Sequence, residues 1–228
     1  MSAIDRVPVL ALDGPSGAGK GTVARRVADH LGWHLLDSGA LYRLTALGAK
    51  RAGVALDDVE GLLGVIERSE IEFESTADGD ELVLLDGATV TDEIRTEQAG
   101  DAASTVASIP AVREALVAKQ HSFAQMPGLV ADGRDMGTII FPHSRLKVFL
   151  TASAEERAKR RHKQLKQKGI DGTFAALYED IRRRDERDAG RSIAPLVPAS
   201  DARTLDTTSM SIEEVVSIIV EMAEKSFK

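Results

Sequence analysis

The 228-residue chain is 43% hydrophobic and 29% charged, carries a formal net charge of −7 and contains no cysteine. Its length suits one core domain with small insertions, and its composition is that of an ordinary soluble protein. The missing cysteines exclude disulfides and thiolate metal sites and fit a reducing cytoplasm. No apolar run approaches the roughly 20 residues of a membrane span, and 4% aromatic residues are too few for a base-stacking nucleic-acid surface. We therefore expect a cytoplasmic monomer that binds neither membranes nor nucleic acid.

The first predicted element is a buried strand over residues 7–12, which runs directly into the glycine-rich stretch GPSGAGKGT. Apolar residues then recur at helical spacing until Gly32, so a helix follows the stretch. A loop between a strand and a helix can surround an anion with backbone N–H groups, and its lysine adds a positive charge. We expect ATP to bind this phosphate loop through Gly14, Pro15, Ser16, Gly17, Ala18, Gly19, Lys20, Gly21 and Thr22.

One position of the loop departs from the common pattern G-x-x-x-x-G-K-[ST]. Gly21 stands where a hydroxyl usually binds magnesium, and the hydroxyl comes one residue later, at Thr22. Mg²⁺ is therefore expected to be held mainly by the nucleotide and water, with no direct protein ligand assigned. This loop resembles that of nucleoside monophosphate kinases more than that of regulatory GTPases, and the guanine-binding pattern [NT]-K-x-D is absent.

Four further strands are predicted in chain order, over residues 33–37, 128–133, 145–150 and 202–207. Turn residues follow them, and most continue into a helical pattern. Ser211 and Glu214 form a capping box that starts the last predicted helix. Strands that alternate with helices indicate an α/β fold with a parallel sheet.

Two stretches break this alternation. Residues 71–94 alternate as strands do, with turns at Asp78-Gly79 and Asp86-Gly87, which predicts a small antiparallel insertion. Residues 155–191 carry 12 Lys/Arg against 8 Asp/Glu and predict two polar helices around 168–173. This basic stretch is either a solvated surface with i,i+4 ion pairs or a lid that closes over bound phosphates.

Polar segments follow the second and third strands, at residues 37–43 and 132–137, and the basic stretch follows the fourth. Ligands of open α/β sheets bind at the carboxyl ends of the strands. Arginine suits phosphate oxygens, and carboxylates suit hydroxyl and amino groups. Each segment alone reads as a turn or loop, but together they favour a site for a phosphorylated, polar acceptor.

Residues 7–22, 34–43, 130–138 and 184–199 closely resemble bacterial cytidylate kinases, and the resemblance extends over essentially the whole chain. It implies the P-loop nucleoside monophosphate kinase fold, with a five-stranded parallel sheet flanked by helices, a small antiparallel β insertion and a short basic lid. Residues 1–228 would form one kinase unit. Its expected parts are a core of 1–65, 95–154 and 192–228, a monophosphate-binding insertion of 66–94, and a lid of 155–191.

The resemblance also implies a reaction, transfer of the ATP γ-phosphoryl group to CMP or dCMP, and a role for each matching residue. Cytosine would be recognised by Ser104, Arg113 and Asp135, and the ribose by Arg184 and Asp188. The acceptor phosphate would be bound by Arg43, Arg134 and Arg191, with Asp37, Ser38 and Tyr42 near the acceptor. Lys20, Arg134, Arg161 and Arg187 would act catalytically on the transferred phosphoryl group. Two alternatives stay open at this point: a kinase of UMP, AMP or a small metabolite, and a nucleotide-binding switch without catalysis.

Overall fold

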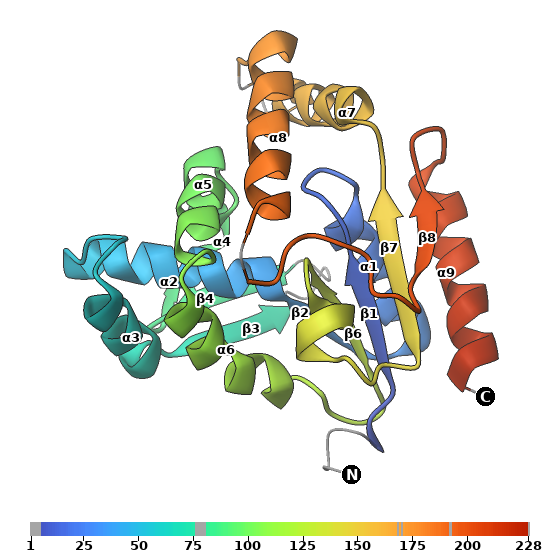
Figure 1. The fold of residues 1–228 in the computed structure, drawn as a ribbon, viewed down its shortest axis with the longest axis horizontal. Helices are drawn as coiled ribbons and strands as arrows, with labels where there is room; N and C mark the ends of the chain where they lie inside the picture. The colour runs from blue at the N-terminus through green and yellow to red at the C-terminus, as the bar shows by residue number, and fades with distance from the viewer. Residues whose placement is uncertain (1–5, 76–80, 168, 170, 192, 228) are drawn as a thin grey trace. The chain divides into compact units, whose positions relative to one another are not determined.

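A computed structural model describes residues 6–75, 81–167, 169, 171–191 and 193–227 (Figure 1). The chain divides into two compact units, residues 1–37 with 120–228, and residues 38–119. The first unit contains β1 (Val9–Asp13), α1 (Lys20–Leu31), β2 (His34–Asp37), β6 (Leu129–Gly133), the π-helix η2 (Met136–Ile140), β7 (Leu146–Thr151), α7 (Ala154–Gln167), α8 (Phe174–Ala189), β8 (Arg203–Asp206) and α9 (Ile212–Phe227). The second contains α2 (Ser38–Ala52), α3 (Val59–Arg68), β3 (Ile71–Ser75), β4 (Glu81–Leu85), β5 (Ala88–Thr89), α4 (Thr91–Ile94) and α5 (Glu97–Val106). Helix α6 (Pro110–Ser122) runs from the second unit into the first.

The first unit is built on a five-stranded parallel sheet with the order β2-β6-β1-β7-β8. The residues of β1 and β6 are all buried, which explains their continuous apolar runs. The five strands predicted from the sequence are confirmed to within a residue or two at each end. The register pairs Asp13 with Gly133 and Asp37 with Asp132. The segments that follow β1, β2 and β6 therefore begin side by side at the carboxyl end of the sheet.

Helices α1 and α9 cover one face of this sheet and share its apolar core (Figure 1). Helix α1 ends where the sequence predicts, at Gly32 with a φ of 65°. The predicted capping box is confirmed, because the Ser211 hydroxyl accepts a hydrogen bond from the Glu214 N–H at 3.2 Å. Near the end of α9, the Phe227 ring meets the Trp33 ring edge to face, with centroids 5.0 Å apart.

The second unit contains the predicted antiparallel insertion as a three-stranded sheet of order β3-β4-β5. Asp86 and Gly87 both have positive φ angles, 53° and 74°, as a tight hairpin turn requires. The other predicted turn, Asp78-Gly79, lies outside the described residues.

The expectation that strand structure continues to residue 94 is wrong, because Thr91–Ile94 form the short helix α4. Val90 and Ile94 are both buried and lie four residues apart, a spacing that fits one face of a helix as well as one face of a strand. The Thr91 hydroxyl accepts a hydrogen bond from the Val83 N–H at 2.9 Å, so its side chain takes the place of a further ladder partner for β4.

The basic stretch forms the two predicted helices, α7 and α8, which pack against each other. The second compact unit is broader than the predicted insertion of 66–94, since α2 packs on α5 and contributes Ala40 and Leu44 to the core around β4. The boundaries 66–94 and 155–191 stay predictions. In the part of the chain that the structure describes, no helix has the length and apolar character needed to cross a bilayer.

Candidate active site

The phosphate loop occupies residues 14–19, between the central strand β1 and helix α1. Gly14 has a φ of 148°, and a Cβ there would lie 2.1 Å from the carbonyl oxygen of Leu150. Only glycine fits this close approach to β7. Gly19 caps helix α1 in the left-handed region, with a φ of 87°. The backbone is thus folded tightly in front of a helix N-terminus, the geometry that binds phosphate.

Lys20 is 6% exposed and lies under this loop. Its Nζ donates a hydrogen bond to the Pro15 carbonyl at 3.0 Å and lies 3.9 Å from Asp132 Oδ1 at the end of β6. Burial, with a smaller contribution from Arg134, lowers the pKa of Lys20 to about 8, against the raising effect of Asp132 and Asp13. Burial raises the pKa of Asp132, while Lys20 lowers it. The loop therefore holds a buried positive charge close to the carboxylates of Asp132 and Asp13.

Gly21 faces the same carboxylate. A Cβ at this position would lie 3.6 Å from Asp132 Oδ2, an ordinary van der Waals distance. A single Cβ would therefore fit beside this carboxylate without a clash. Across the described residues, no group of three or more His, Cys, Asp or Glu side chains gathers in a way that could hold a metal ion.

Asp13, the last residue of β1, connects the loop strand to the segment after β6. Its two carboxylate oxygens accept hydrogen bonds from the Met136 and Gly137 N–H groups, each at 2.8 Å. Burial is the main cause that raises the pKa of Asp13 to about 6, against the lowering effect of the two N–H groups. These bonds satisfy the first N–H groups of the π-helix η2, which begins directly after Asp135. Such helices occur frequently at functional sites.

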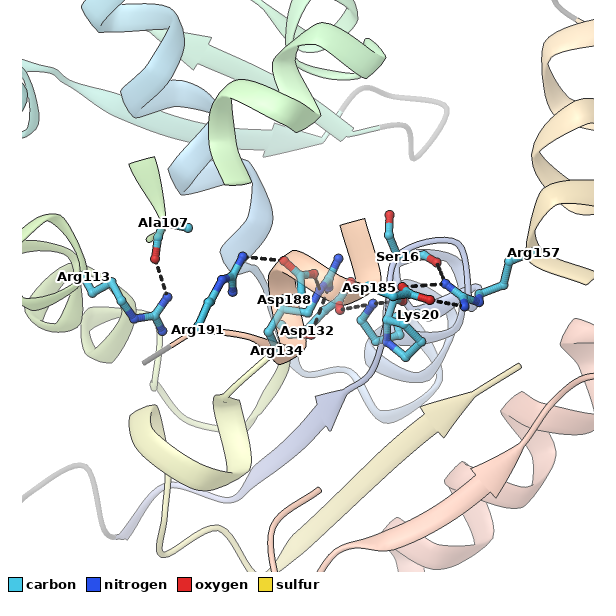
Figure 2. Close-up of polar contacts among 12 residues, drawn as sticks. Ser16, Lys20, Ala107, Arg113, Asp132, Arg134, Arg157, Asp185, Asp188 and Arg191 are labelled. Atoms are coloured by element: carbon cyan, nitrogen blue, oxygen red, sulfur yellow. Dashed lines mark hydrogen bonds and ion pairs between the residues drawn. The ribbon is translucent and has the colours of Figure 1, made fainter. Parts of the chain in front are cut away.

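A buried arginine–carboxylate cluster lies where α8 approaches the end of β6 (Figure 2). Asp188, whose side chain is 2% exposed, accepts hydrogen bonds from Arg134 Nε at 3.2 Å and from Arg191 Nη2 at 2.5 Å. Burial acts to raise the pKa of Asp188, but Arg134, Arg191 and Arg184 outweigh it and hold the pKa below its ordinary value. The structure thus brings together Arg134, Asp188 and Arg191, three residues that the resemblance assigns to the acceptor.

Arg157 of α7 is a buried residue that the sequence did not single out. Its guanidinium lies between the carbonyl of Ser16 in the phosphate loop and the carboxylate of Asp185 on α8 (Figure 2). No signal in the sequence separates it from the other basic residues of 155–191. Asp13 and Asp132 were also given no role, although Asp13 directly follows the first predicted strand and Asp132 belongs to the polar segment 132–137.

The remaining predicted residues of the first unit have varied surroundings. Asp135 is buried, Asp37, Arg161 and Arg184 are half-buried, and Arg187 is exposed. Arg184 lies close enough to Lys20 to contribute to the lowering of its pKa. The roles of all five stay predictions.

In the second unit, Arg113, which is predicted to bind cytosine, is buried on α6. Its Nη1 donates to the Ala107 carbonyl at 3.2 Å (Figure 2). Its guanidinium lies 5.7 Å from the centroid of the Tyr42 ring. Ser104 is buried on α5, and Ser38 is buried at the start of α2. The structure therefore places Tyr42 and Arg113 side by side.

Arg43, which was assigned to the acceptor phosphate, lies on α2. Its Nη1 donates hydrogen bonds to the carbonyls of Ile94 at 2.5 Å and Thr96 at 3.0 Å. These bonds fix the guanidinium at the junction of α4 and α5, and its phosphate role stays a prediction.

A phosphate loop between the central strand and first helix of a five-stranded parallel sheet, with basic helices after the fourth strand, defines a P-loop kinase of the nucleoside monophosphate kinase fold. A profile of the family described as cytidylate kinase matches residues 10–225. The chain belongs to the cytidylate kinase family.

Individual relatives agree with this assignment. A cytidylate kinase of Colwellia psychrerythraea (strain 34H) is 55% identical over 219 residues, which cover 96% of this chain and 97% of the relative. One from Pseudomonas aeruginosa (strain LESB58) is 58% identical over 221 residues, 96% of each chain. Among solved structures, a gluconokinase from Sinorhizobium meliloti 1021 is 14% identical with a TM-score of 0.48, covering 96% of this chain and 92% of its own, a likeness too loose to bear on substrate.

Proposed function

We propose that the chain transfers the γ-phosphoryl group of ATP to CMP or dCMP, giving ADP and CDP or dCDP. The observation that carries this proposal is the match to the cytidylate kinase family over residues 10–225, on a chain whose phosphate loop is folded for anion binding. Kinases of this class need little general-base help from the protein, since the acceptor oxygen already belongs to a phosphate. Catalysis then rests on positioning and on stabilising the negative charge of the transition state.

On the ATP side, the N–H groups of residues 14–19 and the N-terminus of α1 would bind the phosphates. Lys20 would lie on the transferred group, with Arg161 and Arg187 neutralising further charge. A pKa of about 8 leaves most Lys20 side chains protonated at pH 7. A bound polyphosphate would raise this pKa, because it stabilises the charged form. The lysine therefore meets the nucleotide as a cation.

The chemistry of the loop also fits Mg²⁺, which prefers oxygen ligands and retains several waters. The Asp132 carboxylate is the oxygen group beside Gly21 and Lys20, and we propose that it receives a water of the metal. Bound Mg²⁺ would neutralise charge between the β- and γ-phosphates.

For the acceptor, Arg134 and Arg191 would bind the phosphate of CMP, and Asp188 with Arg184 would bind its ribose. Asp188 has two oxygens with about four lone-pair sites, and the two arginines use one site on each oxygen. It can therefore accept from a ribose hydroxyl while it holds both guanidinium groups. Arg43 would add to phosphate binding, and Asp135, Ser104 and Arg113 would read the cytosine.

The test is a panel of acceptors assayed with ATP and Mg²⁺ by ADP release, comparing CMP, dCMP, UMP, AMP and shikimate. We expect CMP or dCMP to give the highest kcat/KM. A higher value for UMP or AMP would replace the assignment with the other nucleoside monophosphate kinases. ATP binding without ADP release on every acceptor would instead indicate a non-catalytic switch.

We further propose that the protein acts as a cytoplasmic monomer without nucleic-acid or membrane partners. The cysteine-free composition and the net charge of −7 support this, since a reducing compartment selects no disulfides and an acidic protein repels nucleic-acid phosphates. Sedimentation at micromolar concentration checks the monomer.

A further inference from the structure

We propose that Arg157 is a positioning residue that couples the phosphate loop to helix α8, so that ATP and the acceptor bind cooperatively. This inference rests on the proposed function and assigns a role to an ion pair that joins the two halves of the reaction. Arg157 comes from α7, its carboxylate partner Asp185 comes from α8, and its carbonyl partner Ser16 belongs to the loop (Figure 2).

The guanidinium of Arg157 is almost fully used by the protein itself. Nε donates to the Ala152 carbonyl at 3.0 Å, and Nη1 donates to the Ser16 carbonyl at 3.0 Å and to Asp185 Oδ1 at 2.9 Å. Nη2 donates to Asp185 Oδ2 at 2.5 Å. An arginine has five N–H donors in a fixed plane, and these four bonds use four of them. The side chain, 4% exposed, therefore acts as a connector within the protein.

On the loop side, this connector fixes the backbone that must surround the phosphates. The Ser16 carbonyl accepts a hydrogen bond from Arg157, so the N–H of the same trans peptide, that of Gly17, points the opposite way. The Cβ of Arg157 also lies 3.3 Å from the place where a Cβ of Gly17 would stand. Any movement of Arg157 therefore moves the loop backbone or loses a charge-assisted hydrogen bond.

On the α8 side, the bidentate pair holds the end of the helix that carries the acceptor residues. Asp185 lies one turn before Asp188, which binds Arg134 and Arg191, and directly after Arg184. A planar guanidinium–carboxylate pair with two parallel bonds fixes orientation as well as distance. The loop and the acceptor cluster are thus joined through one rigid turn of helix.

Coupling of this kind has a thermodynamic signature. If a nucleotide on the loop stabilises the arrangement of α8 that binds the acceptor, it increases the affinity for the acceptor, and the acceptor increases the affinity for the nucleotide by the same factor. A residue that only supports the fold would lower stability and would leave this factor unchanged.

The experiment measures the Kd of CMP by calorimetry with and without a saturating non-hydrolysable ATP analogue and Mg²⁺. For the unchanged chain we expect the analogue to tighten CMP binding by about 10-fold, within the usual range of coupling between sites. Asp185→Asn should reduce the factor to below about 2-fold, because a neutral amide cannot accept two charge-assisted bonds. Asp185→Glu should restore part of it.

Asp180→Asn is the matched control. It removes the same charge from the same helix, but Asp180 pairs with Arg183 on the exposed surface and makes no bond to the loop. We expect it to keep the full coupling factor. Loss of the factor in Asp180→Asn, or its retention in Asp185→Asn, overturns the proposal, as does an unchanged chain whose CMP affinity ignores the analogue.

Arg157→Lys keeps the inference testable if Asp185→Asn does not fold, since lysine keeps the charge but cannot form the planar bidentate pair with the carboxylate. We expect a reduced factor with a folded protein, and a full factor in this variant contradicts the proposal. The acceptor panel separates this result from the proposed function. An unchanged chain that fails on CMP sinks the function, whereas an active chain with unaffected coupling sinks only the role of Arg157.

Discussion

Helix α8 carries charged side chains on two faces with different surroundings. Its outer part is the face with Glu179, Arg182 and Glu186, and its inner part is the face with Asp185 and Asp188. On the outer part, Arg182 lies 3.8 Å from Glu179 and 3.5 Å from Glu186, and these side chains are at least half exposed. On the inner part, the pairs of Asp185 and Asp188 leave the helix and bind arginines from elsewhere in the fold.

The exposed pairs show that one face of α8 is the solvated, ion-paired surface that the sequence predicts, whereas closure of the stretch as a lid stays a prediction. Exposed pairs contribute about 0–1 kcal/mol, because water and salt screen them. A buried carboxylate between arginines has no such screening, and its removal leaves positive charges without compensation. The inner charges should therefore be sensitive to single substitutions and the outer ones insensitive.

The largest effect should come from Lys20, the buried cation under the loop. We expect Lys20→Met to lower kcat by about 10³-fold, the size of effect seen when one preorganised charge-stabilising group is lost. Circular dichroism and the melting temperature control for the fold. Near-normal turnover in a folded Lys20→Met protein contradicts its role.

The next effect tests the inner cluster directly. Asp188→Ala should lower the free energy of unfolding by about 3 kcal/mol, since Arg134 and Arg191 lose their shared partner. It should also raise the KM for CMP more than that for ATP. Urea unfolding and steady-state kinetics measure both, and a stability loss below about 0.5 kcal/mol would remove the distinction between the two parts of α8.

Asp188 of the inner part and Asp13 at the end of β1 are both buried, but their pKa values shift in opposite directions. The pH should therefore affect their contributions to stability in opposite ways. Asp13, which is raised to about 6, favours folding fully below its unfolded pKa near 3.8, and this contribution is lost as the pH rises through 6. Asp188 is lowered, so its contribution is present above 3.8 and lost as the pH falls through its folded pKa. Carboxyl ¹³C NMR of the ligand-free protein should show Asp13 titrating near pH 6, and a midpoint below 4.5 contradicts this.

A smaller effect on a single substrate should come from Asp135. Asp135→Ala should lower kcat/KM for CMP by about 10- to 100-fold, the cost of losing one buried polar contact to the base. Any residual activity on UMP should fall much less, because uracil carries a carbonyl where cytosine has an amine. Equal losses on the two nucleotides exclude Asp135 from base recognition.

The smallest effect should come from the outer part of α8. Arg182→Ala should change the free energy of unfolding by less than about 0.5 kcal/mol and leave kcat unchanged. A change above 1 kcal/mol in urea unfolding would show that the exposed pairs are not screened as we infer.

The sheet and the phosphate loop could be predicted because their signals are local. Strand β1 is a continuous apolar run followed by fixed loop spacing, and Gly14 marks a position that excludes any side chain. The helix at residues 91–94 could not be predicted in this way, because a four-residue spacing of Val90 and Ile94 satisfies both periods. Only the packing of Ile94 decides between them.

A role could be predicted from the sequence where a family motif contains the residue. It could not be predicted where only the tertiary structure gives the residue its partners. Arg157 is one of 12 basic residues in its stretch, and nothing local distinguishes it from the exposed Lys159 two positions later. Its role depends on residues 141 and 28 positions away, Ser16 and Asp185. Asp13 likewise acts through N–H groups more than 120 residues further along the chain.

The pairing of Trp33 with Phe227 gives the protein a built-in optical probe. Trp33 is the single tryptophan of the sequence, and it packs against the last turn of α9 and against Gly128 before β6. Its emission should therefore report whether the C-terminal helix is docked. The unfolding of every variant above can be followed by intrinsic fluorescence, with no label placed near the nucleotide-binding residues.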